Sequence, residues 1–180
     1  MKDDEIDYIE TLGTLCDEPN GLTCSMNAAR QWGKASKLMS FPSFEAAADA
    51  VKTGVISAML APGAYPQISR FIMDAGLKVR ETFSQVIPDL VVVGVNKVMP
   101  REVDVIYHHP ATETLLPEVP LTFDRHEAVT SNTQACIRLI TYSKACAAVT
   151  NRLAANFYDL YVYKVLRGGI VMPFVILAHS

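Results

Sequence analysis

The chain has little charge and no concentration of positive charge. Of its 180 residues only 19% are Asp, Glu, Lys or Arg, and the formal net charge is -3. Lys and Arg are scattered, without the basic stripe with which proteins neutralise the phosphates of duplex nucleic acid. Nucleic acid is therefore not expected as a partner. Half of the residues are hydrophobic, which indicates a folded protein that can bury a core.

Long apolar runs and paired cysteines are missing as well. No segment has enough uninterrupted apolar residues to cross a bilayer, so no membrane contact is expected. The N-terminus does not resemble a signal peptide, and its acidic residues are predicted to form a solvated tail: Asp3, Asp4, Glu5 and Asp7. The four cysteines lie far apart, without a CxxC pair or a histidine at metal-ligand spacing. We expect a cytoplasmic protein with reduced thiols and no structural metal.

The most informative stretch is residues 128–136, where an apolar run ends in four short polar residues and a helical pattern begins. Ser131 or Asn132 is well placed as the N-cap of that helix. The unpaired amides of the first turn, with the positive end of the helix dipole, can hold a carboxylate or phosphate. A well-capped helix without a ligand explains the same residues. Residues 21–25, Gly-Leu-Thr-Cys-Ser, repeat the arrangement, and two such helix starts would suit a small dianion.

Strand and helix patterns alternate along the first half of the chain. Strands are expected over residues 7–12, 37–41 and 55–60, and helices over residues 25–32 and 44–54, the second one capped by Ser43. That order predicts an α/β fold in which helices cover a mostly parallel sheet. Ligands of such sheets bind at the carboxyl ends of the strands.

A second lobe with the same plan is expected from about residue 96. Its strand patterns are residues 104–107, 127–129 and 145–149, and a further helix is expected from Asn151. The predicted division is a first α/β lobe of residues 1–95 and 173–180 and a second α/β lobe of residues 96–172. The ligand cleft is expected between them.

Four short motifs follow one another along essentially the whole chain. They are Gly-Leu-Thr-Cys-Ser at residues 21–25, His-Pro at 109–110, Ser-Asn-Thr-Gln-Ala at 131–135 and Tyr-Asp-Leu at 158–160. They resemble, in this order, Gly-Thr-Phe-Ser, His-Pro, Ser-Thr-x-Ala-Ala and Tyr-Gly-Leu of the prephenate dehydratase family. The resemblance implies a two-lobed, periplasmic-binding-protein-like (type II) α/β fold. The family's Gly-Pro is missing, and residues 15–20 lengthen the first loop.

A closer resemblance is to the bacilysin-biosynthesis prephenate decarboxylase branch. Residues 61–65, Ala-Pro-Gly-Ala-Tyr, are similar to its Val-Pro-x-Ala-Tyr, and residues 149–154 to its Leu-Thr-Asn-x-Leu-Ala. Dehydratases carry Thr-Arg-Phe near the C-terminus, and this chain has Met172-Pro173-Phe174 instead. Because neither Met nor Pro can donate a proton, aromatising dehydration is not expected.

The resemblance therefore implies a carboxy-lyase without a cofactor. It would convert prephenate, without aromatisation, into a dihydro-4-hydroxyphenylpyruvate in specialised amino-acid or antibiotic biosynthesis. The residues expected to hold this small dicarboxylate are Thr23, Ser25, Ser131, Asn132, Thr133 and Met172. His109 is the first choice as proton donor and Tyr65 the second.

Each of these assignments has a simpler alternative. His109 can merely support the loop before Pro110, and Tyr65 can be a packed aromatic. Cys24 and Cys136 lie beside the two predicted anion sites, yet both are explained as small buried residues. For the whole chain, the alternatives are a non-catalytic module that binds a small carboxylate and a prephenate dehydratase. The high apolar content is compatible with a homodimer.

Overall fold

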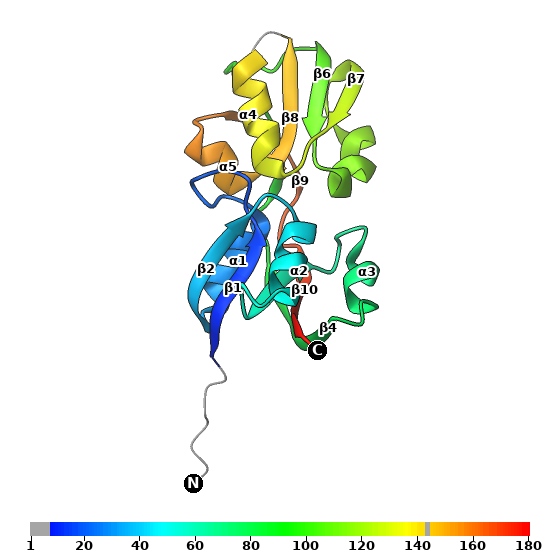
Figure 1. The fold of residues 1–180 in the computed structure, drawn as a ribbon. Coiled ribbons are helices and arrows are strands. Elements are labelled where there is room, and N and C mark those ends of the chain that lie inside the picture. The colour runs from blue at the N-terminus through cyan, green and yellow to red at the C-terminus, as the bar shows by residue number, and fades with distance from the viewer. Residues whose placement is uncertain (1–7, 143–144) are drawn as a thin grey trace. The chain divides into compact units, whose positions relative to one another are not determined.

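The computed structural model describes residues 8–142 and 145–180 (Figure 1). The predicted acidic tail lies outside these residues. The contacts divide the chain into two units, each with its own sheet and core. Unit 1 holds the described residues up to Cys16, Ser25–Gln85 and Met172–Ser180, and unit 2 holds Asp17–Cys24 and Val86–Val171.

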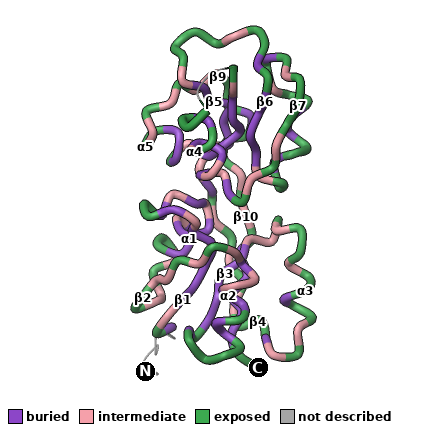
Figure 2. The backbone as a smooth tube through the Cα atoms, turned by 45° about the horizontal axis from the view of Figure 1, so that its top comes forward, coloured by how far each residue is buried: buried purple, intermediate pink, exposed green. Residues whose placement is uncertain are grey.

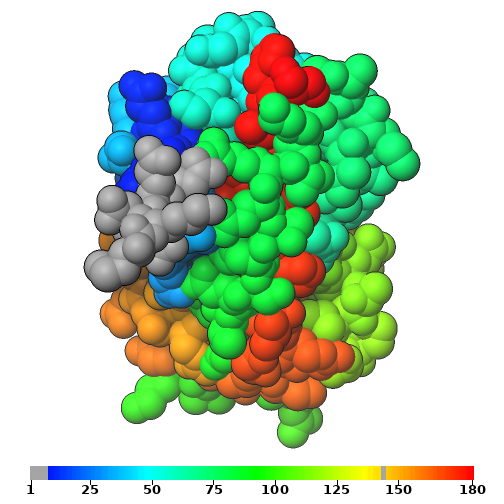
Figure 3. Space-filling view, turned by 90° about the horizontal axis from the view of Figure 1, so that it is seen from below, coloured from blue at the N-terminus to red at the C-terminus, as the bar shows by residue number. Residues whose placement is uncertain are grey.

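The sheet of unit 1 has five strands in the order β2-β1-β3-β10-β4. Their bounds are β1 (Ile9–Leu15), β2 (Ala35–Phe41), β3 (Ala58–Pro62), β4 (Leu77–Val86) and β10 (Val171–His179). β1 pairs in parallel with β2 and β3, whereas β10 runs antiparallel to β3. The sheet is therefore mixed rather than mostly parallel, because the C-terminal strand inserts beside β3. Figure 3 shows residues of β4 in green with the red residues of β10 against them.

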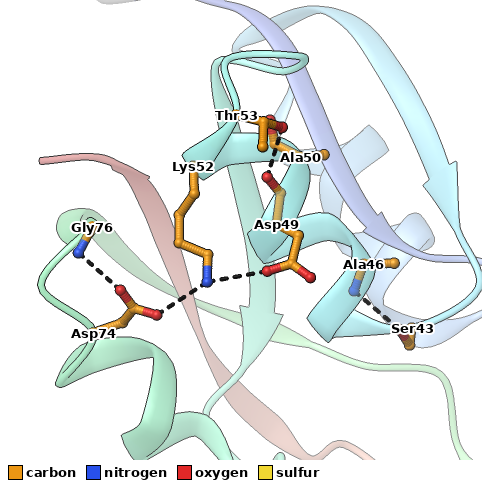
Figure 4. Close-up of polar contacts among 8 residues, drawn as sticks. All are labelled: Ser43, Ala46, Asp49, Ala50, Lys52, Thr53, Asp74 and Gly76. Carbon is orange, nitrogen blue, oxygen red and sulfur yellow. Dashed lines mark hydrogen bonds and ion pairs between the residues drawn. The ribbon is translucent and has the colours of Figure 1, made fainter.

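The helices of unit 1 are α1 (Cys24–Trp32), α2 (Phe44–Lys52) and α3 (Ile68–Ile72). The predicted cap of α2 is confirmed, since the Ser43 hydroxyl accepts a hydrogen bond of 3.1 Å from the amide of Ala46. Figure 4 shows this cap and, at the other end, Lys52 between Asp49 (3.0 Å) and Asp74 (3.2 Å). The apolar face of α2 packs on the sheet around Met59.

The strand predicted over residues 55–60 begins later than expected. Gly54 has a φ of +73°, and the amides of Val55 and Ile56 both bond to the carbonyl of Ala50. These bonds extend the turn that ends α2, so β3 starts only at Ala58. Its carboxyl end then includes Pro62, which pairs with Phe174 of β10.

The sheet of unit 2 has five strands in the order β7-β6-β8-β5-β9. Their bounds are β5 (Leu90–Gly94), β6 (Glu102–His108), β7 (Thr122–Ala128), β8 (Cys146–Asn151) and β9 (Tyr161–Arg167). β6 is parallel to β7 and β8, and β5 is antiparallel to β8 and β9. This sheet thus repeats the plan of the first one, with three parallel strands extended by an antiparallel strand.

Helices cover both faces of this second sheet. α4 (Asn132–Tyr142) and α5 (Arg152–Phe157) lie on one face, where Leu139 and Ala155 pack against Val91. The 3₁₀ helix η1 (Pro110–Glu118) covers the other face, and its Leu116 packs against Ile106. Figure 2 shows β5 and β6 as buried. The predicted α/β class is confirmed.

Candidate functional site

The start of α4 is the candidate site of unit 2. β7 ends at Ala128, short polar residues follow, and the helix begins at Asn132. The Ser131 hydroxyl accepts a hydrogen bond of 3.0 Å from the amide of Gln134, so Ser131 is the N-cap. Of the two caps that the sequence allowed, Ser131 is correct, because Asn132 is already the first helical residue.

Two polar groups in the first turn of α4 have no partner. Among the described residues, the buried side-chain atoms without a hydrogen bond are Asn132 Oδ1 and Thr133 Oγ1. Thr133 is 0% exposed. Buried polar groups are nearly always hydrogen-bonded in native proteins, so a buried hydroxyl without a hydrogen-bond partner needs an explanation. Thr133 Oγ1 is a donor on the first turn of the helix, where the unpaired backbone amides favour an anion, whereas Asn132 Oδ1 can only accept.

A carboxylate of the chain itself lies at this helix start. Asp17 Oδ2 accepts a hydrogen bond of 2.6 Å from the Thr130 hydroxyl, and its Oδ1 accepts one of 2.7 Å from the Ser131 hydroxyl. The Gln134 side chain donates to the Asp17 carbonyl at 3.0 Å. Asp17, Thr130 and Gln134 were not predicted. Asp17 stands in the lengthened first loop, and nothing local in the sequence indicates a partner more than a hundred positions away.

The loop that carries Asp17 is held in place by its own contacts. Glu18 accepts hydrogen bonds of 2.6 Å from the amides of Asn20 and of Leu22. Asn151, which is fully buried, donates from its side chain to the Leu22 carbonyl at 2.9 Å and also caps α5. The loop that carries Asp17 is therefore held in place by hydrogen bonds within unit 2.

Hydrogen bonds between β8 and α4 also hold the first turn of α4 in place. The Thr150 hydroxyl donates to the Asn132 carbonyl at 2.6 Å, and the Cys136 thiol lies 3.1 Å from the same hydroxyl. Burial raises the pKa of Cys136 to about 12 and that of Cys24 to about 11. Both thiols are thus protonated near neutral pH. Cys136 is a small buried residue, as interpreted, whereas Cys24 is partly exposed.

His109 of unit 2 caps the 3₁₀ helix η1. Its Nδ1 accepts a hydrogen bond of 3.2 Å from the amide of Ala111, so the ring proton resides on Nε2. Burial lowers the pKa of His109 to about 4; the neighbouring His108 acts in the same direction and the Asp17 carboxylate opposes it. At neutral pH the ring is therefore an uncharged hydrogen-bond donor through Nε2.

His108, the residue before His109, is fully buried. Its Nδ1 lies 3.0 Å from the His109 carbonyl, which can only accept, so Nδ1 carries the proton. Burial lowers the pKa of His108, and its uncharged Nε2 then accepts from Nδ1 of His126 at 2.9 Å. This histidine pair holds the backbone of the His109 loop.

Tyr65 of unit 1 follows Gly63 in the loop after β3. Its ring packs against Phe44 and Phe71, and its hydroxyl donates to Glu45 Oε1 at 2.6 Å. Burial and the hydrogen bond to Glu45 raise the pKa of Tyr65 to about 12. The phenol therefore keeps its proton across the neutral range.

The remaining predicted residues lie at the ends of α1 and β10. Thr23 and Ser25 are buried on either side of Cys24, the first residue of α1, and Met172 is half-buried in β10. The next residue, Pro173, accepts a hydrogen bond of 2.7 Å at its carbonyl from the amide of Gly63. A Cβ on Gly63 would lie 2.9 Å from Pro173 Cγ, so this contact requires glycine.

No obvious metal site accompanies these residues. Within residues 8–142 and 145–180, no three His, Cys, Asp or Glu side chains are grouped so that they could hold a metal ion. In the same part of the chain, no helix is long and apolar enough to cross a membrane.

Comparisons by sequence find no relatives of the chain. No protein-family model matches it, and a search of curated proteins gives no match.

Solved structures with the same fold are numerous. The prephenate dehydratase from Arthrobacter aurescens, in complex with L-Phe, is 17% identical with a TM-score of 0.67. The prephenate dehydratase from Staphylococcus aureus is 14% identical with a TM-score of 0.61. The match covers 94% and 93% of this chain but only 60% and 66% of those two chains.

A binding protein is similar to the same extent. The methionine-binding protein MetQ is 14% identical with a TM-score of 0.60, and the match covers 98% of this chain and 84% of MetQ. At such identities a likeness shows the fold alone. The chain has the two-lobed type II α/β fold that prephenate dehydratases share with periplasmic-binding-protein-like domains.

Proposed function

We propose that the chain binds prephenate and decarboxylates it without aromatisation and without a cofactor. The observation that carries the binding step is the start of α4, where the orphaned Thr133 hydroxyl lies on the first turn beside a bound carboxylate of the chain itself. A site that holds the Asp17 carboxylate has donors of the right kind for a carboxylate of a ligand.

The reaction requires few groups from the protein. As the bond between the ring carbon and its carboxylate breaks, CO2 leaves and the electron pair moves into the ring diene. A ring carbon then takes a proton, and the ring hydroxyl is retained. Fixed amides and hydroxyls suit the task of holding a carboxylate because they need no reorganisation during the reaction. The seat, defined here as Ser131, Asn132 and Thr133, holds one carboxylate, and Thr23 and Ser25 contact the second one or the ring hydroxyl.

Decarboxylation is favoured over dehydration by the residues of β10. Where dehydratases carry Thr-Arg, this chain has Met172 and Pro173, and the Pro173 carbonyl is already bonded to Gly63. Loss of the ring hydroxyl needs a proton donor, and neither side chain can provide a proton. Met172 contributes an apolar wall instead.

The proton for the ring carbon comes from His109 or Tyr65. His109, with a pKa lowered to about 4 by burial, is uncharged at neutral pH. A dianionic ligand nearby would raise its pKa and favour the imidazolium acid. Tyr65 holds its proton on its own, with Glu45 as the acceptor of its hydrogen bond.

A second function is a non-catalytic module that binds a small carboxylate. It is favoured by the same two residues, because neither His109, with a pKa of about 4, nor Tyr65, with one of about 12, is a ready acid at pH 7. The carboxylate seat is needed under both functions, and the fold is shared with a methionine-binding protein.

Incubation of the chain with prephenate, followed by proton NMR beside a sample without protein, separates the two functions. A non-aromatic dihydro product with release of CO2 establishes decarboxylation. Phenylpyruvate above the control would mean that the Met172-Pro173 segment does not prevent dehydration. Unchanged prephenate that nevertheless binds in a calorimetric titration would favour the binding module and contradict the lyase.

A further inference from the structure

The Asp17 carboxylate is bonded to one residue of the carboxylate seat, Ser131, and to the adjoining Thr130. Its two oxygens accept the hydroxyl protons of Thr130 and Ser131 at 2.6 and 2.7 Å, one on each oxygen. Hydrogen bonds to a charged carboxylate at such distances are among the strong ones in proteins. A ligand carboxylate that uses these hydroxyls must therefore take the place of Asp17.

Asp17 does not depend on these two bonds for its position. Its main chain is fixed separately, because Gln134 donates to the Asp17 carbonyl and Asn151 to the carbonyl of Leu22. Glu18 bonds the amides of the same loop. The Asp17 side chain can thus rotate away from the seat while the loop stays in place, and it can return as soon as the ligand leaves.

The seat retains a free donor while Asp17 is bound. The Thr133 hydroxyl is buried and has no hydrogen-bond partner, although Asp17 accepts from the hydroxyls of Thr130 and Ser131. The internal carboxylate therefore does not saturate the first turn. The Thr133 hydroxyl is thus a further donor for a ligand that displaces Asp17.

We propose that Asp17 is an internal competitor of ligand carboxylates for the hydroxyls of Thr130 and Ser131. This inference rests on the carboxylate seat of the proposed function. A tethered carboxylate competes at a high effective concentration, so it lowers the affinity of every ligand that uses the seat by the same factor. The equal factor leaves the preference among such ligands unchanged and lowers how tightly each of them binds.

Two full-length variants test the competition. Asp17→Asn keeps an acceptor for one hydroxyl and removes the charge, and Asp17→Ser removes the carboxylate with a different side chain. Asp124→Asn is the matched control, since Asp124 is exposed on β7 of the same unit. Circular dichroism and the thermal unfolding midpoint verify that each variant is folded.

The probes are prephenate and phenylpyruvate, which share the pyruvyl side chain but differ in the ring carboxylate. Calorimetric titration should show both binding about tenfold more tightly to the two Asp17 variants, which corresponds to about 1.4 kcal/mol. We place the shared pyruvyl carboxylate in the seat, so the factor should be equal for the two probes, and Asp124→Asn should change neither. Binding that becomes detectable only in the Asp17 variants supports the proposal as well.

Several results would overturn the inference. Affinities that stay within twofold of the unsubstituted chain, or that fall, would show that Asp17 only secures the loop. A gain for one probe alone would show that the two do not share the seat. If neither probe bound any of the proteins, the carboxylate seat would be wrong and the proposed function would fail with it. Prephenate that binds more tightly to Asp17→Asn but is not decarboxylated would contradict only the lyase.

Discussion

The hydroxyl of Ser131 donates to the carboxylate of Asp17 at 2.7 Å while it accepts from the amide of Gln134 at 3.0 Å. One hydroxyl thus caps α4 and binds a carboxylate from a loop 114 positions earlier in the chain. Helix starts bind anions through unpaired amides and the dipole. Here the anion is part of the protein, so an external carboxylate must compete with it for the Ser131 hydroxyl.

Replacement of Thr150 by Val should loosen the start of α4. The substitution leaves the Asn132 carbonyl without its 2.6 Å donor and the Cys136 thiol without its 3.1 Å acceptor. We expect the free energy of unfolding to fall by about 1–3 kcal/mol, measured by urea denaturation. Thr141→Val is the control, because Thr141 bonds the Ile137 carbonyl on the exposed surface, and its cost should stay within about 0.5 kcal/mol. Equal costs would contradict the buried role of Thr150.

Replacement of Asn151 by Ala removes two hydrogen bonds at once. Asn151 caps α5 through the amide of Ala154 and holds the Leu22 carbonyl of the Asp17 loop, both at 2.9 Å. The loss should be about 2–3 kcal/mol, of which the cap accounts for about 1 kcal/mol. Ser43→Ala, which removes only a cap in unit 1, should cost about 1 kcal/mol. A loss no larger than that of Ser43→Ala would mean that the bond to Leu22 contributes nothing.

The stability of the chain should fall on mild acidification because of His109. Its pKa is lowered to about 4 in the folded chain from 6.5, so the unfolded state binds the proton first. Above pH 6.5 the ring is uncharged in both the folded and the unfolded state, so His109 costs no stability. As the pH falls from 6.5 towards 4, the unfolded state takes up the proton and the free energy of unfolding decreases. The lowered pKa of His108 acts in the same direction.

His109→Asn separates this effect from the helix cap. An Asn side chain can still accept from the amide of Ala111 but cannot titrate. Urea denaturation at a series of pH values should show a smaller loss of stability for this variant between pH 6.5 and 4, with the remainder due to His108. An unchanged pH dependence would contradict the burial of His109 as its origin.

Tyr65→Phe tests the second proton donor. Under the proposed lyase, removal of the hydroxyl should lower the rate of prephenate decarboxylation by about 10²–10⁴, the usual contribution of a general acid, with the affinity for prephenate nearly unchanged. Tyr161→Phe, at an exposed position of β9, is the control and should keep the rate. A Tyr65→Phe variant of full activity would leave Tyr65 as a packed aromatic whose hydroxyl only bonds Glu45.

The local signals in the sequence predicted most of the fold. Polar residues before an apolar pattern located the caps Ser43 and Ser131, and alternating strand and helix patterns gave the α/β class. Local patterns do not report strand direction, so the antiparallel insertion of β10 beside β3 was missed. The second helix was predicted to reach residue 54 and the next strand to start at residue 55. The amides of Val55 and Ile56 instead bond to the Ala50 carbonyl, so β3 begins only at Ala58.

The sequence predicted only those residues of the candidate site that are adjacent to one another in the chain. The polar residues 131–133 form one stretch, and the structure places them on the first turn of a helix, as expected. Asp17 looked like one polar residue of a loop, because its partners lie far away in sequence and are brought close only by the packing of unit 2. A departure from the resembled family, the lengthened loop of residues 15–20, was the available signal.

The most direct test of the carboxylate seat is an NMR titration of the isotope-labelled chain with prephenate. The backbone amide signals of Asn132, Thr133 and Gln134 should shift progressively and saturate, together with that of Asp17, whose side chain is displaced. The double variant Ser131→Ala, Thr133→Ala should lose these shifts, whereas Ser43→Ala should keep them. Prephenate that binds without shifting the amides at the start of α4 would contradict the account.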